Sequence, residues 1–152
     1  KGYGTIGNLS DKKLPMLKKL EELIIINAKE FFKLYKNEKI KFITNWPKNF
    51  KIISWSNRLK AEGHNISHIH PSGWVSGVFY LQVPQFSDPG EGCIELSLWK
   101  PGFPTPKKTI PRKRHHPKTG DIILFPSSLF HKTIPFSSDE ERMCIAFDLL
   151  PG

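Results

Sequence analysis

The stretch HNISHIHPSGWVSGVFYLQVP, residues 64–84, places three of the chain's six histidines just before an apolar run rich in Val, Phe and Tyr. His68 and His70 are separated by one residue. Because side chains alternate along an extended strand, both imidazoles are expected on the same side. This is the spacing with which one strand offers two ligands to a single metal ion. The run over 74–83 is apolar on both faces, which predicts a strand that is covered on both sides.

A further histidine, His131, follows the strand-like run GDIILFPSSLF, residues 120–130. From a neighbouring strand its imidazole would close the same site. Three neutral imidazoles leave coordination positions open, which is typical of a catalytic rather than a structural metal centre. His64 is expected to be a solvated loop residue, and His115 and His116 to be solvated or to face the substrate.

The remaining chain predicts a mostly β protein with an N-terminal helix. Apolar residues between Leu14 and Tyr35 recur with the three-and-four spacing of an amphipathic helix, with Pro15 in its first turn. At 152 residues the chain fits one domain, in which a helical segment over 1–38 packs on a β core over 39–152. Short β-type runs separated by Pro, Gly, Ser and Asp favour a sandwich or barrel. These runs are KIKFITNW, FKIISWS, GWVSGVFYLQV, CIELSLW, DIILFP, FHKTIPF and RMCIAFDL.

The last of these runs, RMCIAFDL at residues 142–149, has two unlike faces. One face is bulky and apolar and is expected to lie under the N-terminal helix. The helix is expected to pack on it with Leu17, Leu20, Ile24 and Phe31. The other face is small or polar and leaves room inside the sheet for a ligand. The bulky face holds Met143, Ile145, Phe147 and Leu149, and the other holds Arg142, Cys144, Ala146 and Asp148.

Composition sets broader limits. The formal net charge of +9 favours an acidic partner, but the only dense basic cluster is PKKTIPRKRHHPK at 106–118, within a stretch from 101 to 117 that is expected to be an irregular loop. That loop is either a solvated segment or one that attracts the substrate. Cys93 and Cys144 form no disulfide framework, so a reducing, cytoplasmic setting is expected. No run is long and apolar enough to predict a membrane span or a signal peptide.

Two segments, SHIHPSGWVSGVFYLQVP at 67–84 and GDIILFPSSLFHKTIPFSSDEERMCIAFDLLP at 120–151, resemble the 2-oxoglutarate and Fe(II)-dependent oxygenases. The closest similarity is to a prolyl-hydroxylase-like branch of these enzymes, over about residues 50–151. The resemblance implies a double-stranded β-helix, a jelly roll of the cupin kind, with iron at its mouth. It also implies 2-oxoglutarate and O2 as cosubstrates, with decarboxylation to succinate coupled to oxidation of a substrate C–H bond.

Residue by residue, the resemblance assigns His68 and His131 as iron ligands and puts His70 where most of the family has Asp or Glu. A third neutral ligand makes the site less negative than the usual two-histidine, one-carboxylate triad. Tyr80 matches a tyrosine that holds the cosubstrate in prolyl hydroxylases, although core packing would also explain it. Trp55 and Asn57, in SWSNRL at 54–59, match residues that precede the metal motif and line the pocket, where a structural role is an equal alternative.

Arg142 is the predicted partner of the 2-oxoglutarate carboxylate. It has no acidic neighbour among the small residues of its strand face, and an enclosed guanidinium requires an anion. Its planar fork matches a carboxylate in bidentate fashion. The segment 130–147 is expected to form a hairpin that sets Arg142 across from residues 131–135. The alternative is an exposed arginine that is paired with Asp139 or Glu140.

Three functions therefore compete on sequence alone. The first is an oxygenase, most simply a hydroxylase, acting on a small molecule or a protein side chain. The second is a cupin-type metal barrel with chemistry that does not use 2-oxoglutarate. The third is a noncatalytic module that binds an anion or nucleic acid. Neither the substrate nor the oligomeric state can be read from the pattern, because pocket walls in such folds come from loops.

Overall fold

The computed structural model describes residues 2–5, 7–86, 88–104 and 109–152. Its helical elements are η1 (Leu9–Asp11), α1 (Pro15–Tyr35) and α2 (Lys41–Thr44). Its strands are β1 (Gly2–Gly4), β2 (Phe50–Leu59), β3 (Val75–Gln82), β4 (Ile94–Ser97), β5 (Arg112–His115), β6 (Ile122–Pro126), β7 (Phe130–Thr133) and β8 (Arg142–Pro151).

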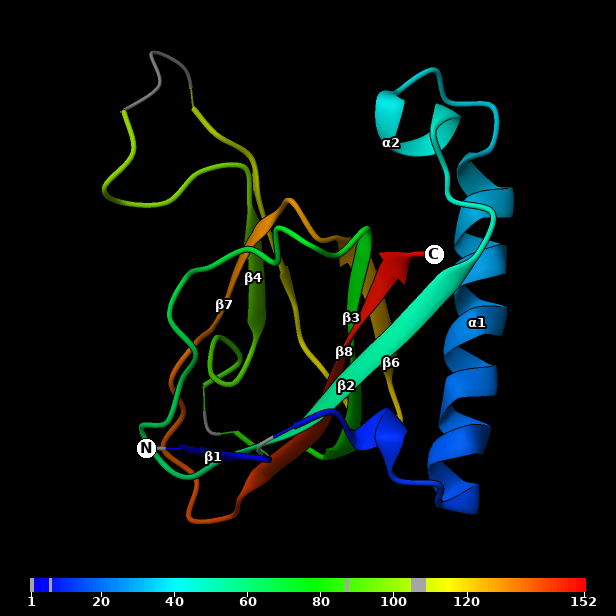
Figure 1. The fold of residues 1–152 in the computed structure, drawn as a ribbon. Helices are drawn as coiled ribbons and strands as arrows, with labels where there is room; N and C mark the ends of the chain where they lie inside the picture. The colour runs from blue at the N-terminus through cyan, green and yellow to red at the C-terminus, as the bar shows by residue number, and fades with distance from the viewer. Residues whose placement is uncertain (1, 6, 87, 105–108) are drawn as a thin grey trace.

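The described strands form two antiparallel sheets (Figure 1). The large sheet has five strands in the order β1-β2-β8-β3-β6, and the small sheet has three in the order β5-β4-β7. Most neighbours, among them β2 and β8, β8 and β3, β3 and β6, and β4 and β7, are not consecutive in sequence, as in the predicted jelly-roll type of β architecture. A cluster of Val78, Tyr80, Ile94, Phe125 and Cys144 fills the space between the sheets.

Helix α1 covers the outer face of the large sheet (Figure 1). Pro15 occupies its first turn, where the missing N–H has no helical partner to lose. Leu20 and Ile24 are buried in one cluster with Phe147 and other residues of the sheet, and Leu17 packs against that cluster, as predicted. Phe31 differs from the prediction: its ring lies 6.1 Å from Phe42 and 6.0 Å from Trp46, centroid to centroid, and not over the strands.

Strand β8 lies at the centre of the large sheet, and its two faces divide as predicted. Ile145, Phe147 and Leu149 are buried beneath α1. Arg142, Cys144 and Ala146 line a cavity on the opposite face. The outward face therefore holds the helix, and the inward face is available for a ligand.

Gly77 of β3 is required by this packing. A methyl group at its Cα would overlap the ring of Phe147, which lies across from it on β8, and would come within 2.6 Å of the Ile123 carbonyl. Any larger residue would push the neighbouring strands apart or displace the Phe147 ring from the core.

Three elements were predicted wrongly or not at all. The run over 39–46 is not a strand but contains the short helix α2. The irregular loop expected over 101–117 contains β5, which pairs with β4 from Ser97↔Arg112 to Ile94↔His115. Residues 105–108 of that stretch, which include the first three of the basic cluster, lie outside the described residues. Strand β1 extends the sheet from within the segment expected to be helical, by pairing with β2.

The predicted hairpin of β7 and β8 was also wrong. Strand β7 pairs with β4 in the small sheet. In the large sheet β8 pairs with β2, where Arg142 is opposite Leu59 rather than residues 131–135. Arg142 nevertheless reaches the same cavity as His131, because the inner faces of the two sheets look toward each other.

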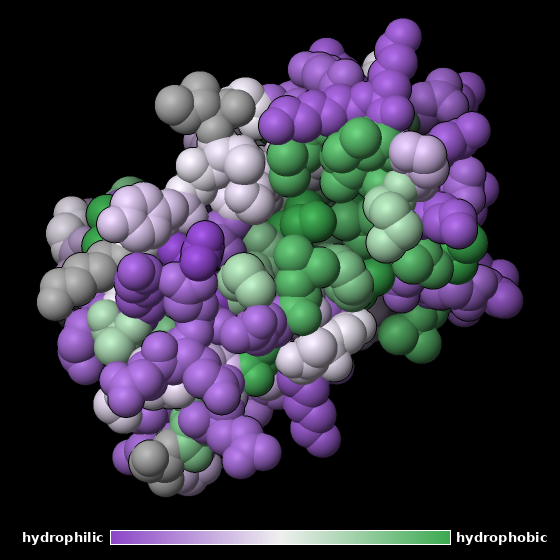
Figure 2. All heavy atoms as spheres, turned by 90° about the horizontal axis from the view of Figure 1, so that it is seen from below, coloured by the Kyte–Doolittle hydropathy of each residue, from purple (hydrophilic) through white to green (hydrophobic). Residues whose placement is uncertain are grey.

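Apolar residues are not confined to the core. Leu14, Met16, Leu23 and Ile26 are exposed on or beside α1. Figure 2 shows a continuous apolar area on the α1 side of the molecule, bordered by hydrophilic side chains. Within the described residues, no helix combines the length and the apolar composition that crossing a membrane requires.

Candidate metal centre

The three predicted histidines come together at one end of the space between the sheets. His68 and His131 form an isolated antiparallel bridge, in which the His68 N–H donates to the His131 carbonyl at 3.1 Å and the His131 N–H to the His68 carbonyl at 3.0 Å. The His70 N–H donates to the Ser127 carbonyl at 3.1 Å, in the turn after β6. Backbone pairing thus fixes all three residues before any ligand binds.

Their rings face one another closely. The ring centroids lie 4.2 Å apart for His68 and His131, 4.9 Å for His70 and His131, and 5.0 Å for His68 and His70. One ring nitrogen of each residue lies within 4.8 Å of those of the other two. A divalent ion with bonds of about 2.1 Å to imidazole nitrogen draws its ligands within about 4.2 Å of each other, so a small rotation of the rings completes the spacing.

The outer nitrogen of each ring has an acceptor that orients it. His68 Nδ1 lies 2.7 Å from the Ile66 carbonyl, and His131 Nδ1 lies 3.1 Å from the Leu129 carbonyl. A carbonyl oxygen only accepts hydrogen bonds, so the proton of each neutral ring is on Nδ1 and the lone pair is on Nε2. This is the tautomer that an Nε2 metal ligand needs.

His131 is held in its neutral form. Burial lowers its pKa to about 4, and the neighbouring rings of His68 and His70 act in the same direction, although the hydrogen bond to Leu129 opposes them. At neutral pH its lone pair is therefore free for a metal without the loss of a proton.

Arg142 lies deeper in the same cavity and is only 2% exposed. Its guanidinium stacks on the Tyr80 ring, 4.9 Å from the centroid, and lies 4.0 Å from Cys144 Sγ. Among the described residues, neither Arg142 Nε nor the Tyr80 hydroxyl has a hydrogen-bond partner. Within the described residues Arg142 forms no ion pair with Asp139 or Glu140, which was the alternative expectation. The neighbouring Glu141 instead pairs with Arg58 and Lys60.

Burying Arg142 Nε and the Tyr80 hydroxyl without hydrogen-bond partners costs folding free energy unless a ligand pairs with them. Burial is the main cause of the raised pKa of Tyr80, against which the Arg142 charge acts, so the phenol stays protonated and able to donate. A buried guanidinium that lines the cavity, with a protonated phenol beside it, suits a carboxylate.

The cavity that joins Arg142 to the histidines is narrow, at about 50 Å³. Trp55 and Asn57 of β2 line it, as predicted, and the Trp55 ring lies 5.4 Å from that of His70. Sequence reasoning did not single out Asn65, Lys132 and Thr133, which lie around the same space. Their position depends on how the small sheet is placed, and no local pattern reveals it.

The other histidines lie outside this cavity. His64 is exposed, with Nδ1 at 3.2 Å from the Glu62 carbonyl. His115 pairs with Asp121 at 3.2 Å, and His116 Nδ1 lies 3.0 Å from Cys93 Sγ.

Two arginines of the basic loop share a structural partner. Glu95 of β4 is 4% exposed and pairs with Arg114 at 2.8 Å, Lys132 at 3.3 Å and Arg112 at 3.9 Å. Burial on its own would raise the pKa of Glu95, but hydrogen bonds from Arg114 and Lys132 outweigh burial and lower it. These cations therefore help to join the three strands of the small sheet.

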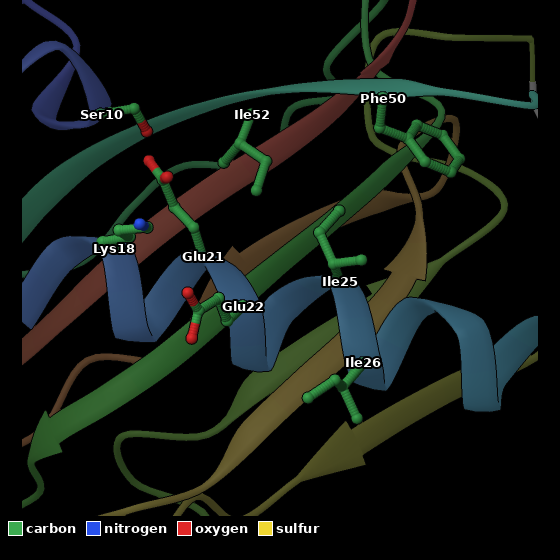
Figure 3. Close-up of a pocket in the computed structure, with 8 residues that line it drawn as sticks. All are labelled: Ser10, Lys18, Glu21, Glu22, Ile25, Ile26, Phe50 and Ile52. Atoms are coloured by element: carbon green, nitrogen blue, oxygen red, sulfur yellow. The ribbon is translucent and has the colours of Figure 1, made fainter.

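A larger hollow, about 710 Å³, lies between α1 and β2 (Figure 3). Ile25 and Ile52 point into it from the helix and the strand, and Glu21 lies near Ser10 at one end. Ile52 is on the outer face of β2, whereas Trp55 is on the inner face, so the hollow and the histidines are on opposite sides of the sheet. None of the described residues that line it is a histidine.

Comparison with known proteins places this geometry in a class. A family model described as "Putative 2OG-Fe(II) oxygenase" matches residues 53–148, more than half of the chain. The chain therefore belongs to the 2-oxoglutarate and Fe(II)-dependent oxygenase family, a class of enzymes defined by these two cofactors. None of the curated proteins matches it.

Solved structures show the same fold. A prolyl-4-hydroxylase from Pseudomonas putida aligns over 99% of this chain and 71% of its own, at 13% identity and a TM-score of 0.56. An oxidoreductase of the 2OG-Fe(II) oxygenase family from Burkholderia pseudomallei aligns over 68% and 45%, at 17% identity and 0.52. HygX from Streptomyces hygroscopicus, with nickel and 2-oxoglutarate bound, aligns over 68% and 57%, at 16% identity and 0.51. The chain thus spans about half the length of two of these proteins.

The residues present fit the family's cofactors. Three neutral imidazoles are ligands that suit Fe(II) among other divalent ions. The unpaired groups of Arg142 and Tyr80 suit the carboxylate of a 2-oxo diacid. His70, which the resemblance puts where most of the family has Asp or Glu, is part of this cluster.

Proposed function

We propose that this chain is a hydroxylase that couples the decarboxylation of 2-oxoglutarate to the oxidation of a substrate C–H bond. The observation that carries the proposal is the enclosed Arg142, whose Nε has no partner among the described residues, in the same cavity as three converging histidines. The Arg142 guanidinium needs an anion, and the three imidazoles suit a metal cation. A single cosubstrate that chelates the metal and ends in a carboxylate serves both.

In this proposal His68, His70 and His131 hold the iron. Each would use Nε2, because the Nδ1 positions of all three rings are already in hydrogen bonds. Iron, when bound, would supply the activation of O2 at the expense of 2-oxoglutarate. The protein contributes a site whose ligands are fixed by backbone pairing and need little reorganisation.

Arg142 would bind the far carboxylate of 2-oxoglutarate through its guanidinium fork, and the Tyr80 hydroxyl would donate a further hydrogen bond. Asn57, on the inner face of β2 across from Cys144, would donate from its amide along the length of the cosubstrate. Apolar walls from Val78, Ile94 and Ala146 exclude water from this part of the cavity, which strengthens each polar contact.

In the overall reaction, substrate C–H, O2 and 2-oxoglutarate give substrate C–OH, succinate and CO2. One oxygen atom of O2 is in the new hydroxyl and the other is in succinate. The substrate would enter beside Trp55, Asn65 and Lys132, and is a small molecule or a protein side chain. We place the protein in a reducing, cytoplasmic setting, a proposal supported by Cys93 and Cys144, which are both free and buried.

The test is a labelling experiment. The iron-loaded protein is incubated with 2-oxoglutarate, candidate substrate mixtures and ¹⁸O2, and products are followed by mass spectrometry. A product that gains one ¹⁸O atom, matched by labelled succinate, supports hydroxylation. A product that loses two hydrogens or changes only its stereochemistry, with succinate still formed, would show a different outcome at the same centre and contradict the hydroxylase assignment.

A further inference from the structure

His70 differs from the other two histidines of the site in what holds it. The Nδ1 atoms of His68 and His131 contact backbone carbonyls. His70 Nδ1 instead lies 2.7 Å from both carboxylate oxygens of Asp148. The one histidine that stands in the usual place of an acidic ligand is therefore the one with an acid directly behind it.

Asp148 is built into the core rather than placed at a surface. It is 5% exposed, on the inward face of β8. Ser76 Oγ donates to Asp148 Oδ1 at 2.6 Å and lies 2.8 Å from Ser127 Oγ. Because a hydroxyl carries a single proton, Ser127 must donate to Ser76 when Ser76 donates to Asp148. Both hydroxyls therefore point their protons toward the carboxylate.

Gly73 leaves the room that this arrangement needs. A Cβ atom at Gly73 would lie 2.5 Å from Ser127 Oγ and 3.4 Å from Asp148 Cγ. The chain thus closes over the Asp148 carboxylate, and no water-filled space separates the carboxylate from His70.

The charges around the cavity show why an acid here matters. Arg142 lines the cavity, and none of the lining residues within the described chain is acidic. Lys132, the other cation of the lining, is paired with Glu95. A metal cation bound by three neutral rings would therefore share the cavity with the Arg142 charge and with no acidic lining side chain. Asp148 supplies a negative charge one imidazole ring away from the metal position, in a medium where charges interact more strongly than in water.

We propose that Asp148 is a positioning residue that, through His70, gives the metal centre the negative charge lost when histidine took the place of the carboxylate ligand. The inference rests on the proposed function, because it assumes that His70 is a ligand. A carboxylate that accepts from Nδ1 fixes the ring and makes its Nε2 a more basic donor. The charges of the ion, Arg142, Asp148 and a bound dicarboxylate then cancel.

The experiment compares Co(II) binding to the wild-type protein and to three variants, by calorimetry and by the visible absorption of the bound ion. Asp148→Asn keeps the shape and an acceptor for Nδ1 but removes the charge. Ser76→Ala removes a donor but keeps the charge. Asp121→Asn removes an acid of the same type that pairs with His115 outside the site.

We expect Asp148→Asn to bind Co(II) about 10- to 100-fold more weakly, with a shifted absorption spectrum and an unchanged fold. Ser76→Ala should show a smaller loss, and Asp121→Asn none. Co(II) affinity and spectrum in Asp148→Asn equal to wild type would overturn the inference while leaving the metal centre intact. Failure of the wild-type protein to bind Co(II) would instead contradict the proposed function.

A second measurement does not require a metal or a variant. The ¹⁵N NMR shifts of the imidazoles in the metal-free protein report which nitrogen carries the proton. We expect Nδ1–H and a bare Nε2 at His70. A proton on Nε2, with Nδ1 bare, would show that His70 does not donate to Asp148 and would overturn the inference even if Asp148→Asn does not fold.

Discussion

Arg142 is the residue whose surroundings say most about a ligand. Its burial would cost several kcal/mol without a counter-charge, yet its contacts in the described structure are the Tyr80 ring and the Cys144 sulfur. Replacing it therefore separates metal binding from cosubstrate binding, because within the described structure it has no hydrogen bond to any of the three histidines.

We predict that Arg142→Ala retains metal affinity and loses affinity for 2-oxoglutarate, by about 2 to 5 kcal/mol if the site is desolvated. Arg142→Lys is the matched control: it keeps the charge but loses the bidentate fork, so its loss should be intermediate. Titration of 2-oxoglutarate into each metal-loaded variant measures the effect. Unchanged affinity in Arg142→Ala would remove this residue from the site.

His131 predicts a pH dependence of the metal-free protein. Its folded-state pKa of about 4 lies below the ordinary value of 6.5, so between these values the unfolded chain binds a proton that the folded protein excludes. Stability should therefore fall as the pH drops from 6.5 toward 4, by up to about 3 kcal/mol from this group.

The measurement is the free energy of unfolding in urea at a series of pH values, with metal removed. Other groups titrate in the same range, so the comparison is with His131→Gln, in which this contribution is absent. An equally steep slope in both proteins would mean that His131 titrates normally in the folded state.

At the scale of elements, alternate side chains of β8 have different tasks: one face packs under α1, and the other lines the cavity. Phe147 is fully buried beneath α1, and the adjacent Ala146 lines the cavity. We predict that Phe147→Ala destabilises the fold by about 3 to 5 kcal/mol, the usual cost of such a cavity. Ala146→Leu should instead fill the ligand space and abolish 2-oxoglutarate binding at a smaller cost in stability.

Thermal unfolding and 2-oxoglutarate titration of both variants provide the check. We expect Phe147→Ala to lose mainly stability and Ala146→Leu to lose mainly 2-oxoglutarate binding. If Ala146→Leu binds 2-oxoglutarate normally, the inner face of β8 does not contact the cosubstrate.

The sequence predicted β8 because its alternation is strict, and it predicted the histidine cluster because His68 and His70 share one strand face. Helix α2 was missed because KIKFITNW alternates like a strand. As a helix it places Phe42, and Trp46 just after its end, against Phe31. Strand β5 was missed because RKRH has no apolar face, and Glu95 of β4 stabilises it by pairing with Arg112 and Arg114.

The role of Asp148 was also not predicted, although its place on the inward face beside Arg142 was. Its contact with His70 joins residues 78 positions apart. Such a contact depends on how the segment before β3 folds back over β8, and local periodicity carries no information about it. The only signal in the sequence was that Asp148 and Arg142 are an even number of positions apart, which puts both on the inward face of the strand.

For the whole molecule, the excess of positive charge has a partial structural explanation. Glu95 pairs with Arg112, Arg114 and Lys132 across the small sheet. These residues are partly exposed but also help to hold the small sheet together, so a nucleic-acid-binding role is not needed to explain them. Family membership, over residues 53–148, accounts for the region that carries all three histidines and Arg142.

The central claim is that this fold consumes 2-oxoglutarate at an iron held by His68, His70 and His131. The most direct measurement is succinate formation from 2-oxoglutarate, in the presence of O2, by the Fe(II)-loaded wild-type protein and by His131→Ala. The account predicts iron-dependent succinate with the wild type and none with the variant. Iron-loaded wild-type protein that forms no succinate, or a variant that forms as much, would contradict it.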